Sequence, residues 1–271
     1  MLRRGRWLCI AAFVGIAWCA ADPETVWREY LDWYRRQPVS VTDARARYLE
    51  HLRASGKDHQ EIQERGRIIE RFSRERRDEL QPLFFDRTYA SQTPRFNAAP
   101  NALLVEAVRE RPPGKALDAH MGQGRNAVYL ASLGWDVTGF DYSEEGVRAA
   151  RLAAQKAGVK LNAVVARHEE FDFGASRWDL IVLSYTWLPL RSPYVEKILA
   201  SLKPGGLLVF EHMMDESGSQ TAAPWLPRPN QLLELFGSLR ILRYEDVRAQ
   251  ADWSWRPERV ARLVAEKPRL P

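Results

Sequence analysis

The pattern of hydrophobic and polar residues changes near Asn101. From there to the end of the chain, short apolar runs alternate with segments whose apolar residues recur at helical spacing. This alternation is typical of a mostly parallel β-sheet covered by helices on both faces. The predicted strands are 116–119, 136–140, 162–166, 180–184, 207–211, 239–244 and 260–265. The predicted helices lie near 102–110, 125–133, 143–157, 192–202 and 229–236.

The last two predicted strands are joined by only a short irregular segment. Two parallel neighbours need a crossover of a dozen or more residues, usually a helix, so these two strands should run antiparallel. A dinucleotide-binding fold would end in parallel strands only. We therefore expect an α/β fold, with a seven-stranded, doubly wound, mostly parallel sheet whose last strand is antiparallel, plus an N-terminal helical extension.

The helical extension is expected over residues 22–98, and the α/β domain over 99–271. Between Glu24 and about Leu83 the chain is rich in Arg and Glu, and its apolar residues recur at helical spacing, which predicts two or three helices. The sequence that follows, up to Asn101, is aromatic and loop-like. Its residues Tyr89 and Phe96 could close over a ligand as a lid, or could simply pack the extension against the sheet.

Residues 1–21 have a composition of their own. Three arginines precede an apolar run from Trp7 to Ala21, and small residues end that run. This pattern predicts a secretory signal peptide, or a hydrophobic segment that stays as an anchor, and it is short for a spanning helix of about 20 apolar residues. Both cysteines, Cys9 and Cys19, lie inside this segment, so they indicate nothing about disulfides in the remainder of the chain.

The charged residues are numerous but mixed in sign. The chain has 40 Lys and Arg against 35 Asp and Glu, a formal net charge of +5, and the two signs interleave along the predicted helices. Such mixing is typical of a solvated helical face rather than a nucleic-acid-binding patch. The five histidines are scattered, without the spacing of metal ligands. We expect no nucleic acid and no metal as partners, and a membrane only through an uncleaved N-terminal segment.

The segment ALDAHMGQGRNA, residues 116–127, carries the candidate chemistry. Asp118 ends the first predicted strand, and Gly122 and Gly124 follow before a helix begins. Glycine lets the backbone turn with positive φ and approach a ligand, and the start of a helix offers free N–H groups. Asp141 ends the second strand about 20 positions later, where an acid can bind the two hydroxyls of a ribose. The combination predicts a cofactor that contains a nucleoside.

Asp118 distinguishes between two such cofactors. A carboxylate at this position would repel the pyrophosphate of NAD, whereas it would attract the ammonium and sulfonium groups of S-adenosylmethionine (SAM). Each residue also has a purely structural explanation. The glycines could make a tight turn, Asp118 could bond to amides of that turn, and Asp141 could cap the helix that starts at Ser143. Their occurrence together on consecutive strands favours the SAM site.

Residues 114–212 resemble class I SAM-dependent methyltransferases. The string GQGRNAVYLASLGWDVTGFDYS resembles the tellurite- and thiopurine-methyltransferase branch, and the similarity continues through WDLIVLSY and LKPGGLLVFEH. The resemblance implies SAM as the cofactor, with Asp118 near its ammonium group, Asp141 at the ribose and Tyr142 at the adenine. The residues that it places around SAM are Asp118, His120, Gly122, Gly124, Asp141, Tyr142, His168, Glu169 and Ser184.

The chain departs from the family pattern at two positions. His120 stands where the family has its first loop glycine, so an imidazole lies where backbone usually passes close to the ligand. Arg167 stands where family members often have an acid after the third strand, which leaves His168 or Glu169 to contact the adenine.

The reaction implied by the resemblance is methyl transfer to an acceptor held in line with the S–CH₃ bond. A general base is needed only if the acceptor must lose a proton. The candidates near the strand ends are Tyr185, Glu211 and His212, each of which could also serve only in packing or in bonding the chain. We expect a small-molecule acceptor, which the sequence does not identify. The alternatives are an NAD(P)-dependent Rossmann oxidoreductase and a non-catalytic binding protein on a degenerate methyltransferase fold.

The expected location contains a conflict. The signal-like segment predicts a protein that is exported or anchored in a membrane, with the arginines favouring a domain on the outside. SAM is made in the cytosol, so a cytoplasmic location is the alternative that cofactor supply favours.

Overall fold

The computed structural model describes residues 22–38, 43–90, 96–216, 223–252 and 257–269. The chain forms two compact units, which divide after Arg77. The predicted signal-like segment 1–21 lies outside the described residues. The domain boundary expected after residue 98 stays a prediction.

The first unit consists of three helices, α1 (Pro23–Arg35), α2 (Ala44–Ala54) and α3 (His59–Glu75), and α3 packs against both others. An aspartate caps the start of each helix by accepting a backbone N–H, as Asp22 does from Thr25. The helical spacing of the apolar residues places them in one shared core. That core contains Val26, Trp27, Tyr30, Tyr48, Ile62, Ile69 and Phe72.

Helix α4 (Arg77–Ala90) corrects one expectation from the sequence. The loop-like region expected from residue 83 begins as helix, because residues 83–90 continue α4. Phe85 and Tyr89 are four residues apart, so their rings share one face of the helix, with centroids 5.8 Å apart. Pro82 lies inside the helix and normally indicates a break. Packing of the aromatic face therefore outweighs the local preference.

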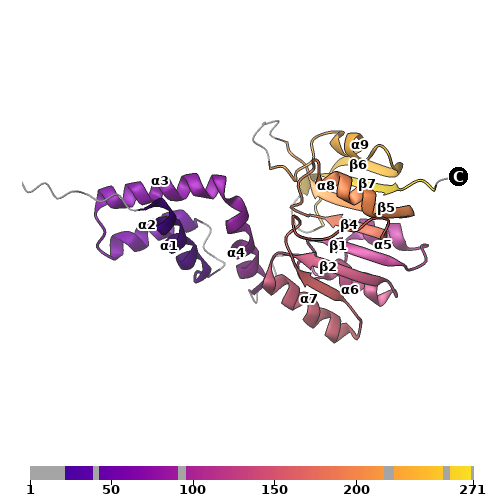
Figure 1. The fold of residues 1–271 in the computed structure, drawn as a ribbon, viewed down its shortest axis with the longest axis horizontal. Helices are drawn as coiled ribbons and strands as arrows, with labels where there is room; N and C mark the ends of the chain where they lie inside the picture. Colours follow the sequence, from indigo (N-terminus) through magenta and orange to yellow (C-terminus); the bar gives the residue numbers. More distant parts are fainter. Residues whose placement is uncertain (1–21, 39–42, 91–95, 217–222, 253–256, 270–271) are drawn as a thin grey trace, which may run out of the picture. The chain divides into compact units, whose positions relative to one another are not determined.

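The second unit contains one seven-stranded sheet of order β3-β2-β1-β4-β5-β7-β6, shown in Figure 1. The strands are β1 (Lys115–Ala119), β2 (Asp136–Asp141), β3 (Asn162–Val165), β4 (Trp178–Ser184), β5 (Leu202–Met213), β6 (Arg240–Gln250) and β7 (Pro257–Glu266). The helices that cover the sheet are α5 (Ala102–Val108), α6 (Arg125–Ser132), α7 (Glu144–Ala157), α8 (Tyr194–Ser201) and α9 (Gln231–Phe236).

The direction of the strands confirms the predicted topology. Strands β1 to β5 pair in parallel, whereas β7 pairs antiparallel with both β5 and β6. Only residues 251–256 separate β6 from β7, which is too few for a crossover helix. The last strand therefore returns between β5 and β6 in the opposite direction.

The sheet is covered on both faces, as the continuous apolar strands predict. One buried cluster joins the sheet to α5, α6 and α7 through residues such as Leu104, Leu130 and Val147. The other joins it to α8 and α9 through Ile198 and Phe236. Because the strands β1, β2 and β4 are parallel neighbours, their carboxyl ends meet at one edge of the sheet, and this edge carries the candidate site.

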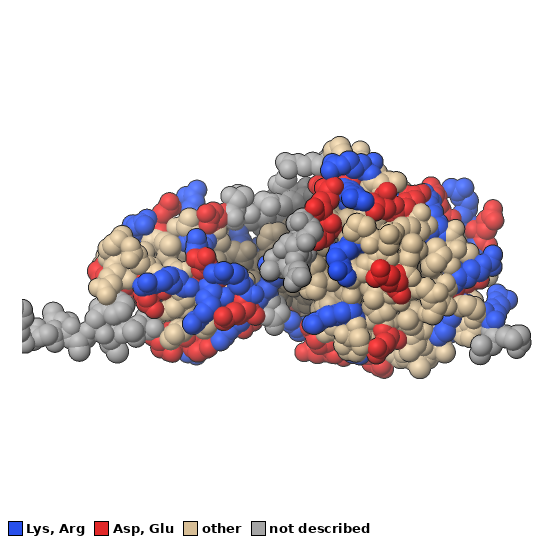
Figure 2. Space-filling model, turned by 90° about the horizontal axis from the view of Figure 1, so that it is seen from above, with Lys and Arg blue, Asp and Glu red and all other residues tan. Residues whose placement is uncertain are grey.

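On the face that Figure 2 shows, basic and acidic side chains are interspersed rather than gathered by sign. Many of them pair within a helix or between neighbours, as Arg65 does with Glu29 and Glu61. Within the described ranges, no helix combines the length and the apolar character needed to cross a membrane.

Candidate functional site

The loop between β1 and α6 turns through three residues with positive φ. These residues are His120 at 54°, Gly122 at 53° and Gly124 at 78°. A Cβ on Gly124 would lie 2.8 Å from the Cβ of Ala150, so a larger residue would push α6 and α7 apart. The turn therefore needs glycine at this position for both conformation and space. It delivers the start of α6, with its free N–H groups, to the end of β1.

Asp118 ends β1 beneath this turn. The residue is only 2% exposed, and its Oδ2 atom has no hydrogen-bond partner among the described residues. Burial raises the pKa of Asp118 to about 7, against the lowering effect of the nearby Arg125. A buried carboxylate with an unpaired oxygen is costly unless a cation or donor approaches it. The site is thus suited to a cationic group.

A cavity of about 610 Å³ opens above Asp118. Among the residues singled out from the sequence, its lining includes Asp118, His120, Gly122, Gly124, Ser184, Tyr185 and His212. The lid candidates Tyr89 and Phe96 also line it. The remaining candidates do not line it: Asp141 and Glu211 are buried, Tyr142 and His168 are half-buried, and Glu169 is exposed.

Asp141 lies at the end of β2 and is engaged by the backbone. One of its oxygens accepts from the N–H of Gly122 at 2.9 Å, and the other accepts from that of Ser143 at 2.9 Å. Burial raises the pKa of Asp141 to about 6. The carboxylate therefore ties the glycine turn to the start of α7, and its predicted role at a ribose stays a prediction.

The side chains of α4 cover this end of the sheet. Asp86 accepts from the hydroxyl of Ser143 at 2.5 Å and from the backbone N–H of Glu145 at 3.3 Å, at the start of α7. The ring of Tyr89 lies so close to the glycine turn that a Cβ on Gly122 would be 2.5 Å from its hydroxyl oxygen. A helix from outside the predicted domain thus lies over the region where the nucleoside is expected.

The residues predicted at the adenine form an aromatic cluster. The ring of His120 lies 5.2 Å from those of Tyr142 and His168, and Phe85 of α4 packs 5.9 Å from Tyr142. Nε2 of His168 lies 3.1 Å from a carboxylate oxygen of Glu169. The structure therefore gathers the predicted adenine residues at one place, beneath the α4 side chains.

The three candidate bases occupy different environments. The hydroxyl of Tyr185 donates to Glu211 at 2.5 Å and accepts from the backbone N–H of Asp252 at 2.9 Å. The second oxygen of Glu211 pairs with Arg262 at 2.9 Å. Burial and the carboxylate of Glu211 raise the pKa of Tyr185 well above its ordinary value. Tyr185 and Glu211 are thus committed to a polar network.

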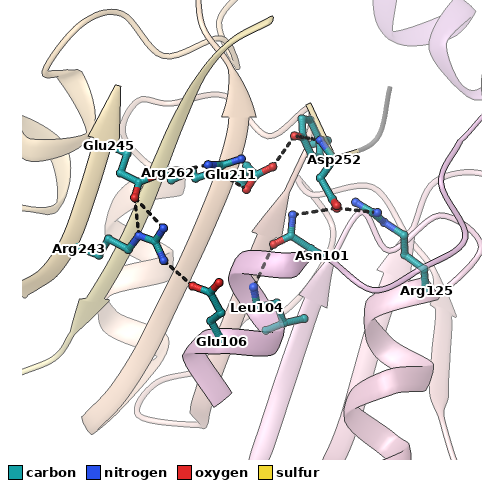
Figure 3. A network of polar contacts seen from close by, with 10 residues as sticks. Asn101, Leu104, Glu106, Arg125, Glu211, Arg243, Glu245, Asp252 and Arg262 are labelled. Carbon is teal, nitrogen blue, oxygen red and sulfur yellow. Dashed lines mark hydrogen bonds and ion pairs between the residues drawn. The ribbon is translucent and has the colours of Figure 1, made fainter. Parts of the chain in front are cut away.

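Figure 3 shows this network extending to Arg125, directly after the glycine turn between β1 and α6. The side chain of Asp252 accepts from Asn101 at 3.1 Å and from Arg125 at 2.8 Å. Arg125 is the first residue of α6, so the segment after β6 is tied to the helix that follows the glycine turn. Asp252 and Asn101 could not be predicted as neighbours of the site, because both lie in irregular segments outside the motif.

His212 is free of this network. It is 1% exposed, its Nδ1 lies 3.0 Å from the carbonyl oxygen of Met213, and its Nε2 has no partner among the described residues. Burial lowers the pKa of His212 to about 4. The hydroxyl of Ser184, which also lines the cavity, is likewise unpartnered within the part of the chain that the structure describes.

Comparison with known proteins identifies the class of this unit. Residues 116–206 match a family model described as a methyltransferase domain. The chain is 26% identical over 153 residues to the probable S-adenosyl-L-methionine-dependent methyltransferase TehB of Haemophilus influenzae, covering 53% of this chain and 52% of that protein. Both findings support a SAM-dependent methyltransferase domain in this unit. The chain spans about half the length of the curated relatives it matches.

Solved structures share the fold. The crystal structure of TehB from Haemophilus influenzae superposes with a TM-score of 0.54 at 22% identity, covering 68% of this chain and 66% of that one. The N-methyltransferase NodS from Bradyrhizobium japonicum, solved with S-adenosyl-L-homocysteine (SAH), superposes with a TM-score of 0.53 at 18% identity, covering 68% of this chain and 96% of that one. The methyltransferase domain and its relatives support SAM as the cofactor.

The residues of the methyltransferase domain fit the amino-acid end of SAM. The unpaired, buried oxygen of Asp118 suits an ammonium group, and the turn at Gly122 and Gly124 leaves backbone exposed to the cavity. If the nucleoside of SAM binds where we predict, the side chains of Phe85 and Tyr89 would have to move from their present positions. Among the described residues, no group of three or more potential ligands is arranged to hold a metal ion.

Proposed function

We propose that the protein transfers a methyl group from SAM to a small-molecule acceptor. The observation that carries the proposal is the unpaired, buried carboxylate oxygen of Asp118 facing the cavity of a methyltransferase domain. When bound, SAM supplies an electrophilic methyl group on a sulfonium. The chain's own contribution is to hold the acceptor in line with that methyl group and to exclude water, which is where much of the rate enhancement of such a reaction arises.

A small acceptor is favoured by the shape of the site. The cavity is of the size of small-molecule sites, about 300–1,000 Å³, and apolar side chains such as Trp187, Trp225 and Leu226 line it. The mixed charge on the face in Figure 2 differs from the basic stripe typical of nucleic-acid-binding proteins. The matches to methyltransferases do not favour the NAD(P)-dependent alternative.

Isothermal titration with SAM, SAH and NAD tests the proposal. We expect SAM and SAH to bind and NAD not to bind. The variant Asp118→Asn should weaken SAM binding by at least about tenfold, because removing one partner of a buried charge pair costs about 2–5 kcal/mol. The variant Asp136→Asn, at the exposed opposite end of β2, should leave the affinity unchanged. Tight NAD binding without SAM binding would sink the proposal, and binding of none of the three would favour a non-catalytic protein.

For location, we propose that residues 1–21 direct export or anchoring, on the basis of the arginines and the apolar run that follows them. A cytoplasmic location remains the alternative, because it gives access to SAM. Cell fractionation combined with N-terminal sequencing of the mature protein distinguishes the two. A chain that starts near Asp22 in an exported fraction supports the signal peptide, and an intact soluble cytoplasmic chain contradicts it.

A further inference from the structure

The part of the cavity beyond Ser184 has an aromatic wall. The rings of Trp187 and Trp225 are stacked with centroids 4.7 Å apart and planes 10° apart, and the ring of Phe85 lies nearly perpendicular to that of Trp187 at 5.0 Å. All three side chains line the cavity, together with Met213. Flat apolar walls of this kind bind flat apolar molecules, because aromatic surfaces lose much water contact when they meet.

In this apolar part of the cavity, the protonation of the two ring nitrogens of His212 is set by a neighbouring carbonyl group. The carbonyl oxygen of Met213 can only accept a hydrogen bond, so the neutral ring carries its proton on Nδ1 and a lone pair on Nε2. The side chain of His212 is buried and lines the cavity. Its Nε2 atom has no hydrogen-bond partner among the described residues. An unsatisfied buried acceptor of this kind is expected to meet a donor on a bound molecule.

The surroundings of His212 keep its ring neutral before the reaction. Burial favours the neutral ring, whereas the backbone carbonyls of Met213 and Thr186 raise the pKa of His212 and would stabilise an imidazolium once formed. The ring of Tyr185 lies 5.6 Å away, and that of Phe210 lies 6.4 Å away. His212 therefore starts neutral near physiological pH and can accept a proton during a reaction.

The other two candidates cannot act in this way. Tyr185 already donates its proton to Glu211, and Glu211 is held by Arg262 and is absent from the lining of this cavity. Ser184 ends β4 opposite Glu211 in the sheet, and its hydroxyl is a second unpartnered polar group in the same cavity within the described residues. The cavity thus combines an apolar wall with two polar atoms, one of them a proton acceptor.

We propose that the acceptor is a flat, largely apolar molecule with a hydroxyl or N–H group, and that this group gives its proton to Nε2 of His212. The proposal rests on the proposed methyl transfer. The O–H or N–H bond breaks and its proton moves to Nε2, while the freed electron pair forms the bond to the methyl carbon. The electron pair of the S–CH₃ bond returns to sulfur, and His212 later releases its proton to solvent.

The test uses two probes of equal shape on the full chain. 2-Naphthol must lose a proton on methylation, whereas 2-naphthalenethiol is already largely ionised near neutral pH. The variant His212→Gln should lower the rate of methyl transfer to 2-naphthol by about 10²- to 10⁴-fold, the usual effect of removing a general base. It should lower transfer to the thiolate by less than about tenfold. The control His59→Gln, at an exposed position in α3, should change neither rate.

Binding provides a readout that does not depend on turnover. In the presence of SAH, 2-naphthol should shift the ¹⁵N resonance of Nε2 of His212, because a hydrogen bond forms there. The variant Trp225→Leu should weaken binding of 2-naphthol by about tenfold or more, since a planar ring stacked on an aromatic side chain contributes about 1–3 kcal/mol. The affinity for SAH should be unchanged in both Trp225→Leu and His212→Gln.

The outcomes separate this proposal from the proposed function. If SAM and SAH do not bind, the proposed function itself fails. If SAH binds but 2-naphthol neither binds nor is methylated, the acceptor class is wrong and methyl transfer stands. If His212→Gln lowers the rates with both probes equally, His212 is not the proton acceptor, and only the pattern of a large loss with 2-naphthol and a small one with the thiol supports it.

Discussion

At the scale of single residues, Asp118 links the site to pH. Burial holds the pKa of its carboxyl at about 7, and a bound ammonium group requires the ionised form. Binding of SAM should therefore release a proton when the pH is below this pKa. We expect the affinity for SAM to rise by about tenfold per pH unit up to about pH 7 and then to level off. Isothermal titration at several pH values measures this, and Asp118→Asn should flatten the profile.

The same burial makes Asp118 a cost to stability. Its pKa in the folded protein lies above the ordinary value of 3.8, so the folded state holds the proton more tightly than the unfolded state does. The resulting stability is present at low pH and is lost as the pH rises towards about 7. Without ligand above that pH, Asp118→Asn should raise the free energy of unfolding by up to about 4 kcal/mol, the equivalent of a shift of about three pKa units, and should raise the Tm by several degrees. A lower Tm would show that the charge is compensated in the folded protein.

His120 is the second residue whose substitution is informative. Its φ of 54° is unfavourable for a residue with a Cβ, and Nδ1 accepts a hydrogen bond from the backbone N–H of Trp187 at 3.2 Å. His120→Gly removes the conformational cost and opens space at the turn. We expect an affinity for SAM equal to or better than that of the wild type, measured by titration. A loss of more than about tenfold would mean that the imidazole itself contacts the ligand.

At the scale of elements, side chains of α4 lie over the place where we expect the nucleoside to bind. Tyr89 lies against Gly122 and Gly146, and Asp86 bonds to the start of α7. A nucleoside bound against Gly122, as we predict, would displace the ring of Tyr89, and this displacement would cost part of its binding free energy. Tyr89→Ala should therefore raise the affinity for adenosine and SAH by several-fold in titrations, whereas Phe84→Ala, on the exposed side of α4, should not. A decrease with Tyr89→Ala would show that the ring stacks on the ligand instead.

At the scale of the whole molecule, the two compact units have separate cores. The first has the aromatic cluster of Trp27, Tyr30 and Phe72, and the second has the two layers around the sheet. Among the residues that the structure describes, those that line the cavity all belong to the second unit. A chain that begins at Asp78 should therefore fold and bind SAH within about threefold of the full chain. Loss of the cooperative thermal transition or of binding in that chain would show that the first unit supports the site.

The sequence by itself determined the α/β topology and the meeting of Asp118 and Asp141 at one edge of the sheet. Hydrophobic periodicity located all seven strands, and the short link before β7 required an antiparallel return. Asp118 and Asp141 could be placed together because the carboxyl ends of parallel neighbouring strands meet at one edge. These inferences depend on local pattern and on rules of chain connection, which a sequence contains.

Only the tertiary structure decided what surrounds that site. The loop expected after residue 83 became helix because Phe85 and Tyr89 pack on a sheet edge that local preference does not describe. His212 and Glu211 are neighbours in sequence, yet one faces the cavity and the other is held by Arg262, because successive residues of a strand point to opposite faces. Contacts between distant segments set burial, hydrogen bonding and proton affinity, and these decide which candidate can do chemistry.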